Sequence, residues 1–242
     1  GFSHIFDVNI EAFHSPVELI FYVFLGILCS GVGFFFVKIF HSIHDNIFTK
    51  LPIHKVFIPA IGGLLVGCVG FFRPEVIGEG FHIIQQAING NVGADWTSAC
   101  RLFALFALLK IFATTFTIQS GGSGGIFGPS LFIGGMLGGF VGTLSHHFFP
   151  QYVPEVAPFI IVGMASFFAG VSNASIAALV IVCELTGGYE LLPPLMLVTV
   201  ISLIFSKKFS IYRNQAKNKF HSKAHLWDMN PGTLKEIKIK EA

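Results

Sequence analysis

Residues 121–139 read GGSGGIFGPSLFIGGMLGG and lie between two apolar segments of the chain. Five glycines occur between Ser120 and Pro129. A glycine in a helix interior costs about 1 kcal/mol relative to alanine, so this cluster does not favour one continuous helix. It predicts a bend followed by a new helix. Pro129 suits the first turn of that helix, because its missing N–H costs nothing there.

The start of a helix after such a bend is a candidate anion site. Its first N–H groups have no partner within the helix, and the helix dipole places about half a positive charge at the same end. Together these groups bind an anion without a cationic side chain, and weakly enough to release it. A bend that serves only packing is the alternative. A nucleotide site is not supported, because the run lacks the Lys of a phosphate loop and no G-x-G-x-x-G follows a strand.

Glycines in the same region also recur at helical spacing. Gly134, Gly138 and Gly142 are four residues apart, as are Gly135 and Gly139. Small residues at this spacing form stripes along which the backbones of neighbouring helices approach closely. The spacing predicts tight helix packing on this segment.

The composition of the whole chain is that of a membrane protein. Of its 242 residues, 53% are hydrophobic and 12% are charged, against about 25% charged in a soluble domain. The mean hydropathy is +0.73. Between Ile111 and Ser206 the only charged residues are Glu155, Glu184 and Glu190. We therefore expect an integral, multi-pass membrane protein whose main partner is the lipid bilayer.

The apolar segments differ in length, and this difference predicts an unusual membrane fold. Three short segments near the end of the chain cannot cross a hydrocarbon core of roughly 30 Å at about 1.5 Å per residue, so half-spanning helices are expected. Such helix ends are tolerated at membrane depth only inside protein or beside an aqueous cavity. The long segments are residues 17–40, 56–72, 96–118 and from Pro129 to about 149, the short ones are 159–170, 174–185 and 191–205, and residues 41–55 and 73–97 are expected to be polar links.

The last 36 residues have a different character. Residues 207–242 contain nine Lys/Arg and three Asp/Glu. Basic residues that directly follow the last apolar segment indicate a cytosolic tail by the positive-inside rule. No aromatic residues interleave these lysines in the manner of a stacking surface, so nucleic acid is not an expected partner.

Metal and enzyme sites are not indicated. The four cysteines are far apart, and the ten histidines show no HExxH spacing, so no metal or cofactor is expected. No Ser/His/Asp arrangement is evident, and an intramembrane hydrolase is the disfavoured enzyme alternative.

Two glutamates each have two interpretations. Glu79 lies between two glycines and is either a solvated turn residue or a residue that faces an aqueous vestibule or binds a cation. Glu184 either lies on a proton path or hydrogen-bonds locally near the end of its segment.

Four stretches, in order along the chain, carry a resemblance to a known family. The loop matches its third signature, GxFxP, at residues 125–129. The chain is similar to the CLC family of chloride channels and chloride/proton exchangers in this signature and in four further stretches. These stretches are LGILCSGVGFFF (25–36), AIGGLLVGCVGFFRPEVIGEGF (60–81), ASIAALVIVCELTGGYELLPPL (174–195) and SIYRNQ (210–215). The resemblance implies an all-α, polytopic, inverted-repeat membrane fold with half-spanning helices, of which this chain holds the second half and the last helix of the first.

The resemblance also implies a site and an activity. Chloride, as the transported ligand, would be bound at Gly125, Ile126 and Phe127, through the backbone N–H groups of Ile126 and Phe127, and by the hydroxyl of Tyr212. Read without the family, Tyr212 is equally an interfacial aromatic residue. The loop that leads into the helix would consist of Ser123, Gly124, Gly128 and Pro129. A homodimer is implied, with residues 17–40 and 174–205 contributing to its interface.

Other parts of the family pattern do not occur in this sequence. The family carries a GSGIP loop and a G(K/R)EGP loop with a gating glutamate in its N-terminal half, and neither string is present. Channel and proton-coupled exchanger therefore both stay open. We expect residues 1–16 to be a truncated connector, 17–221 a partial transmembrane domain, and 222–242 a connector toward a CBS-type domain. The alternative function is a structural or regulatory half-fold that transports nothing without the missing half.

Overall fold

The computed structural model describes residues 5, 6, 8, 16–52, 54–187, 189–206 and 209–212, and within this part of the chain the regular structure is helical. The chain divides into two units, Gly1–Ile211 and Tyr212–Ala242. The helices of the described residues belong to the first unit. They are α1 (Glu18–Asn46), α2 (Ile58–Phe72), α3 (Phe81–Ile88), α4 (Trp96–Gln119), α5 (Phe127–Phe148), α6 (Ala157–Ser172), α7 (Ser175–Thr186) and α8 (Leu192–Ser206), with single 3-10 turns at Phe48–Lys50, Lys55–Phe57 and Pro74–Val76.

The helices fall into two length classes, as the apolar segments predict, except that α2, expected among the long segments at residues 56–72, is one of the short helices. Three of them, α1, α4 and α5, are long and apolar enough to cross a membrane. The apolar helices α2, α6, α7 and α8 have 15, 16, 12 and 15 residues. A 12-residue helix is about 18 Å long, well short of a hydrocarbon core of roughly 30 Å. The short helices α6, α7 and α8 confirm the prediction made for residues 159–205.

One helix boundary and one additional helix differ from the sequence prediction. The first helix continues to Asn46, six residues beyond the apolar segment that ends at Phe40. Residues 41–46 contain no glycine or proline, so nothing in them stops the helix. The link at 73–97 contains α3, which the expectation of a polar loop misses. This helix is amphipathic and buries Ile83, Ile84 and Ala87. Its apolar residues recur at helical spacing on one face and do not form a continuous apolar segment, so a search for apolar segments does not find it.

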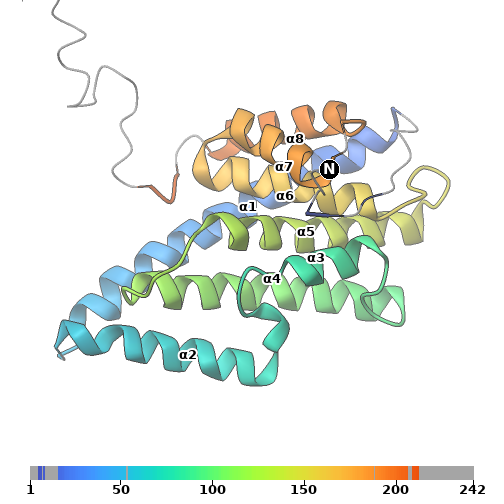
Figure 1. The fold of residues 1–242 in the computed structure, drawn as a ribbon. Helices are drawn as coiled ribbons and strands as arrows, with labels where there is room; N and C mark the ends of the chain where they lie inside the picture. Colours follow the sequence, from blue (N-terminus) through green and yellow to red (C-terminus); the bar gives the residue numbers. More distant parts are fainter. Residues whose placement is uncertain are drawn as a thin grey trace, which may run out of the picture. The chain divides into compact units, whose positions relative to one another are not determined.

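The glycine stripes of α5 are packing surfaces. α5 packs between α4 and α6 (Figure 1). A Cβ on Gly134 would meet the backbone of Gly163 on α6, and one on Gly138 would meet the backbone of Phe159. On the other side, a Cβ on Gly139 would lie 2.7 Å from ring atoms of Phe103 on α4. The prediction of close packing is confirmed, and these contacts fix the position of α5.

Candidate functional site

The glycine run first ends α4. The N–H of Gly122 donates to the carbonyl of Thr117 at 3.0 Å, and the N–H of Gly121 donates to the carbonyl of Ile118 at 3.1 Å. Gly121 has φ of +89°, in the left-handed region that favours glycine. Together these features form a Schellman motif, the common way of closing a helix C-terminus. The predicted bend therefore has a defined backbone geometry.

The run then opens α5 without a cap. Ile126, with φ of −93°, precedes the helix and no side chain caps it. The first turn contains no acidic residue. Within the residues that the structure describes, the N–H groups of Ile126 and Phe127 have no hydrogen-bond acceptor, and the first bond into the helix is from Ser130 N–H to the Ile126 carbonyl at 3.0 Å. Pro129 lies in the first turn, as predicted. The N–H groups at this end of α5 therefore stand without a partner among the described residues, where the helix dipole is positive.

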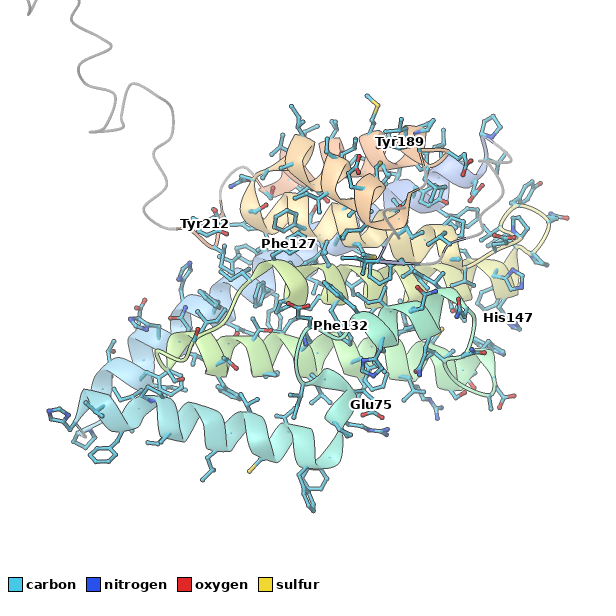
Figure 2. All side chains as sticks on the ribbon, viewed as in Figure 1. Glu75, Phe127, Phe132, His147, Tyr189 and Tyr212 are labelled. Atoms are coloured by element: carbon cyan, nitrogen blue, oxygen red, sulfur yellow. The ribbon has the colours of Figure 1, made fainter. Side chains whose placement is uncertain are left out.

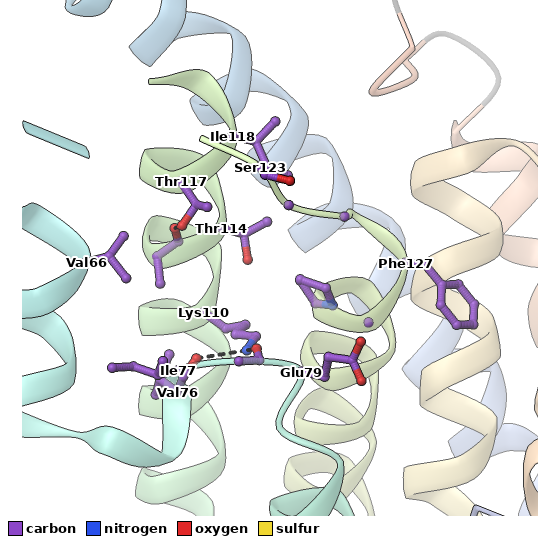
Figure 3. Close-up of a pocket in the computed structure, with 16 residues that line it drawn as sticks. Val66, Val76, Ile77, Glu79, Lys110, Thr114, Thr117, Ile118, Ser123 and Phe127 are labelled. Atoms are coloured by element: carbon purple, nitrogen blue, oxygen red, sulfur yellow. Dashed lines mark hydrogen bonds between the residues drawn. The ribbon is translucent and has the colours of Figure 1, made fainter. Parts of the chain in front are cut away.

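A cavity of about 400 Å³ lies at this end of α5 (Figure 3). One wall is the loop and the first turn of α5, the second is a face of α4, and Val66 of α2 and the segment after α2 complete it. Its lining residues are Val66, Val76, Ile77, Gly78, Glu79, Lys110, Ala113, Thr114, Thr117, Ile118, Ser123, Gly124, Gly125, Phe127, Gly128 and Pro129. Most of the predicted loop therefore lines one cavity.

The predicted residues do not all lie at this cavity. Ile126 is not among its lining residues. Phe127 contributes to the lining, while its ring packs edge-on against Phe168 of α6 with centroids 5.2 Å apart. Phe127 and Phe132 both project from α5, near its start (Figure 2). Tyr212 begins the second unit of the chain, and its role in anion binding stays a prediction.

Lys110 is the main feature of the cavity that sequence reasoning missed. This α4 residue is 2% exposed. Its Nζ donates to the carbonyl of Val76 at 2.8 Å and to that of Gly78, and it lies 4.9 Å from the ring centroid of Phe132. The ammonium thus holds the 76–78 segment against α4. The expectation of a site built without a cationic side chain must be corrected, since a full positive charge lines the same cavity. The signal in the sequence was a lysine inside an apolar span, a default indication of function.

Glu79 supplies the opposite charge. It lies between Gly78 and Gly80, whose φ values are +70° and +78°, so it sits on a tight turn. It also lines the cavity, and its Cγ lies 3.5 Å from the position that a Cβ on Gly128 would occupy. Glu79 is exposed on a turn, as the first interpretation has it, and it also faces the first turn of α5; a role at a vestibule or a cation stays a prediction. Among the lining residues only Lys110 and Glu79 carry charge, and they interact electrostatically.

Glu184 is not part of this cavity. Its Oε1 accepts a hydrogen bond of 2.6 Å from the hydroxyl of Tyr189, five residues further along the chain. This contact confirms the local, structural interpretation of Glu184. A carboxylate near the end of α7 is thereby stabilised beside the turn into α8.

Comparison with known proteins identifies the family of the chain. The family model described as voltage gated chloride channel matches residues 1–207. The chain belongs to this family. Among curated CLC relatives, the voltage-gated ClC-type chloride channel ClcB of Escherichia coli (strain SMS-3-5 / SECEC) is 31% identical over 191 residues, covering 78% of this chain and 44% of that protein. ClcB of Salmonella typhimurium (strain LT2) is 30% identical over 221 residues, covering 88% of this chain and 50% of the relative. The chain spans about half the length of the curated relatives it matches.

Solved structures of CLC proteins have the same fold. A slow cyanobacterial Cl⁻/H⁺ antiporter superposes with a TM-score of 0.75 at 22% identity, covering 86% of this chain and 47% of that one. A CLC-type fluoride/proton antiporter superposes with a TM-score of 0.67 at 21% identity, covering 86% and 49%. The predicted CLC-type helical membrane fold is confirmed. Family membership and the apolar helices together make the chain part of an integral membrane protein.

Proposed function

We propose that this chain forms the anion-binding half of a CLC-type protein that moves chloride across a membrane, either as a channel or in exchange for protons. The observation that carries the proposal is the uncapped start of α5 at a cavity of about 400 Å³. Amide N–H groups and the helix dipole attract an anion there. They also hold it weakly enough for release, which conduction requires.

Gly125, Ile126 and Phe127 are the proposed backbone ligands, with the hydroxyl of Tyr212 as a further donor. Support comes from the free N–H groups of Ile126 and Phe127 among the described residues and from the place of Gly125 and Phe127 in the cavity lining. We expect Tyr212→Phe in the full-length protein to weaken chloride binding about tenfold, the loss of one hydrogen bond to a charged partner. Calorimetric titration with chloride measures this change, with Tyr189→Phe as the control. Equal chloride affinity of Tyr212→Phe and the wild type would remove Tyr212 from the site.

A homodimer with a cytosolic tail is also proposed. α1 packs against α8, and α7 packs against α8 as well. These helices expose large apolar side chains that lipid or a second copy of the chain can cover: Ile20, Phe24, Ile27, Phe34, Phe35, Ile176, Val180, Met196, Val200, Ile204 and Phe205. Crosslinking in bilayers tests the dimer, and recovery of monomers alone would contradict it.

The second candidate function is a half-fold that transports nothing without further protein. It is favoured by the coverage of the relatives, since the chain matches only 44% and 50% of two ClcB proteins. Chloride efflux from liposomes that carry the 242-residue chain, compared with the full-length protein, separates the two. Efflux from the 242-residue chain alone would reject the half-fold. Uphill proton movement driven by a chloride gradient in the full-length protein would identify an exchanger, and its absence a channel.

A further inference from the structure

The hydroxyl of Thr114 differs from those of the neighbouring threonines Thr115 and Thr117 on α4, because it makes no bond to its own helix. Thr115 donates to the carbonyl of Ile111 at 2.7 Å, and Thr117 donates to that of Ala113 at 2.8 Å. Such bonds to the preceding turn are the usual way for a threonine to satisfy its hydroxyl inside a helix. No hydrogen bond of the Thr114 hydroxyl occurs within the described residues. The residue is only 5% exposed, but its hydroxyl oxygen is not among the fully buried unpartnered atoms, so it is open to the cavity that Thr114 lines. A hydroxyl that opens into a cavity and makes no bond to its own helix is free to donate to a ligand there.

Thr114 faces the proposed anion site. It lines the cavity from α4, one turn after Lys110 and almost one turn before Thr117. Figure 3 shows the side chains of Lys110 and Thr114 on the side of α4 that faces the loop before α5. Residues four apart on a helix share a face, so the hydroxyl of Thr114 and the ammonium of Lys110 lie on the same wall. The opposite wall carries the open start of α5.

The two walls offer complementary donors to a small anion. The α5 side supplies backbone N–H groups, and the α4 side supplies an unsatisfied hydroxyl. The ammonium of Lys110 already donates to the carbonyls of Val76 and Gly78. It is therefore held in place and acts on the anion through its charge rather than by moving to bind it.

We propose that Thr114 donates its hydroxyl to the anion bound at the start of α5. The ligand class is a small inorganic monovalent anion, of which chloride is the probe. The inference rests on the proposed function and adds a side-chain ligand from α4 to it. Neither the sequence pattern nor the family match assigns this residue a role.

The test compares three variants of the full-length protein by calorimetric titration with chloride. Thr114→Val keeps the shape of the side chain and removes the donor. We expect its Kd for chloride to rise about tenfold, the order of one hydrogen bond to a charged partner. Thr114→Ser restores the donor and should bind chloride within about twofold of wild type. Thr115→Val removes the neighbouring hydroxyl, which is fully buried and bonded to its own helix, and should leave the Kd unchanged.

The outcomes separate this inference from the proposed function. Wild-type affinity in Thr114→Val would overturn the inference and leave the anion site standing. The same affinity loss in Thr114→Ser or Thr115→Val would also overturn it, because the effect would then not follow the hydroxyl. Absence of chloride binding and efflux in folded wild-type protein would overturn both proposals. If Thr114→Val does not remain monodisperse in detergent, Thr114→Ala, compared with Thr114→Ser, decides the question by the same criteria.

Discussion

Gly138→Ala is expected to destabilise the protein through the contact between α5 and α6. A Cβ at this position would lie 2.6 Å from the carbonyl carbon of Phe159 and 2.8 Å from the Cα of Ile160. The carbonyl oxygen of Phe159 would be closer still. Carbon atoms in contact prefer about 3.5–4.0 Å, so the two helices must separate by about an ångström or more. Backbone atoms cannot rotate away as a side chain does. Overpacking typically costs about 1–3 kcal/mol, and a clash with backbone atoms belongs at the upper end of that range. The better helix propensity of alanine returns about 0.5–1 kcal/mol, which leaves about 2 kcal/mol of destabilisation.

Thermal unfolding of the purified protein in detergent measures this effect. Gly67→Ala is the matched control, because it lies in the interior of α2 and no atom is within 4 Å of its Cβ position. We expect this control to unfold at the wild-type temperature or slightly above it, since alanine is the better helix former. The reasoning is refuted if Gly138→Ala is as stable as Gly67→Ala. Because α5 carries the proposed site, Gly138→Ala should also weaken chloride binding, whereas Gly67→Ala should not.

The other predictions concern the loop and the charges of the cavity. Gly121→Ala should lower the unfolding temperature in the same assay by the equivalent of about 1 kcal/mol, because φ at Gly121 is +89°; a stability equal to wild type would contradict this. Glu79→Gln should lower the Kd for chloride several-fold, since it removes the negative charge of the cavity lining; Glu75→Gln, the same change at a residue that does not line the cavity, is the control, and equal effects of the two would argue against a local cause. Lys110→Met should raise the Kd for chloride and also cost about 1–3 kcal/mol of stability, because the carbonyl of buried Val76 loses its partner; unchanged binding would show that the ammonium serves packing alone.

The features that the sequence predicts well are local ones. The glycine run at 121–128 identifies the bend, because both its Schellman motif and the uncapped start of α5 are formed by consecutive residues. Segment length predicts the short helices α6 to α8 for the same reason. Close packing at Gly134 and Gly138 follows from spacing alone, although the partner helix does not.

The features that the sequence misses depend on residues far apart in the chain. Lys110 and Glu79 are 31 residues apart, and neither indicates by itself that both face the first turn of α5. Thr114 differs from its neighbours only in that its hydroxyl does not donate to a carbonyl of the preceding turn. This difference can be recognised only when the hydrogen bonds are known. α3 escapes prediction because its eight residues mix polar and apolar side chains and follow a turn-prone stretch.

The direct contact of the α5 and α6 backbones has a consequence for the speed of ion passage in the proposed transport. Because glycines form the contact, no side-chain rotamer change can loosen the two helices, and the N-terminus of α5 is held in a fixed position. An arriving ion meets dipoles that are already aligned and need no rearrangement to receive it. The slow part of each crossing is then the stripping of the ion's water shell, so ions that hold water less tightly should enter the cavity faster.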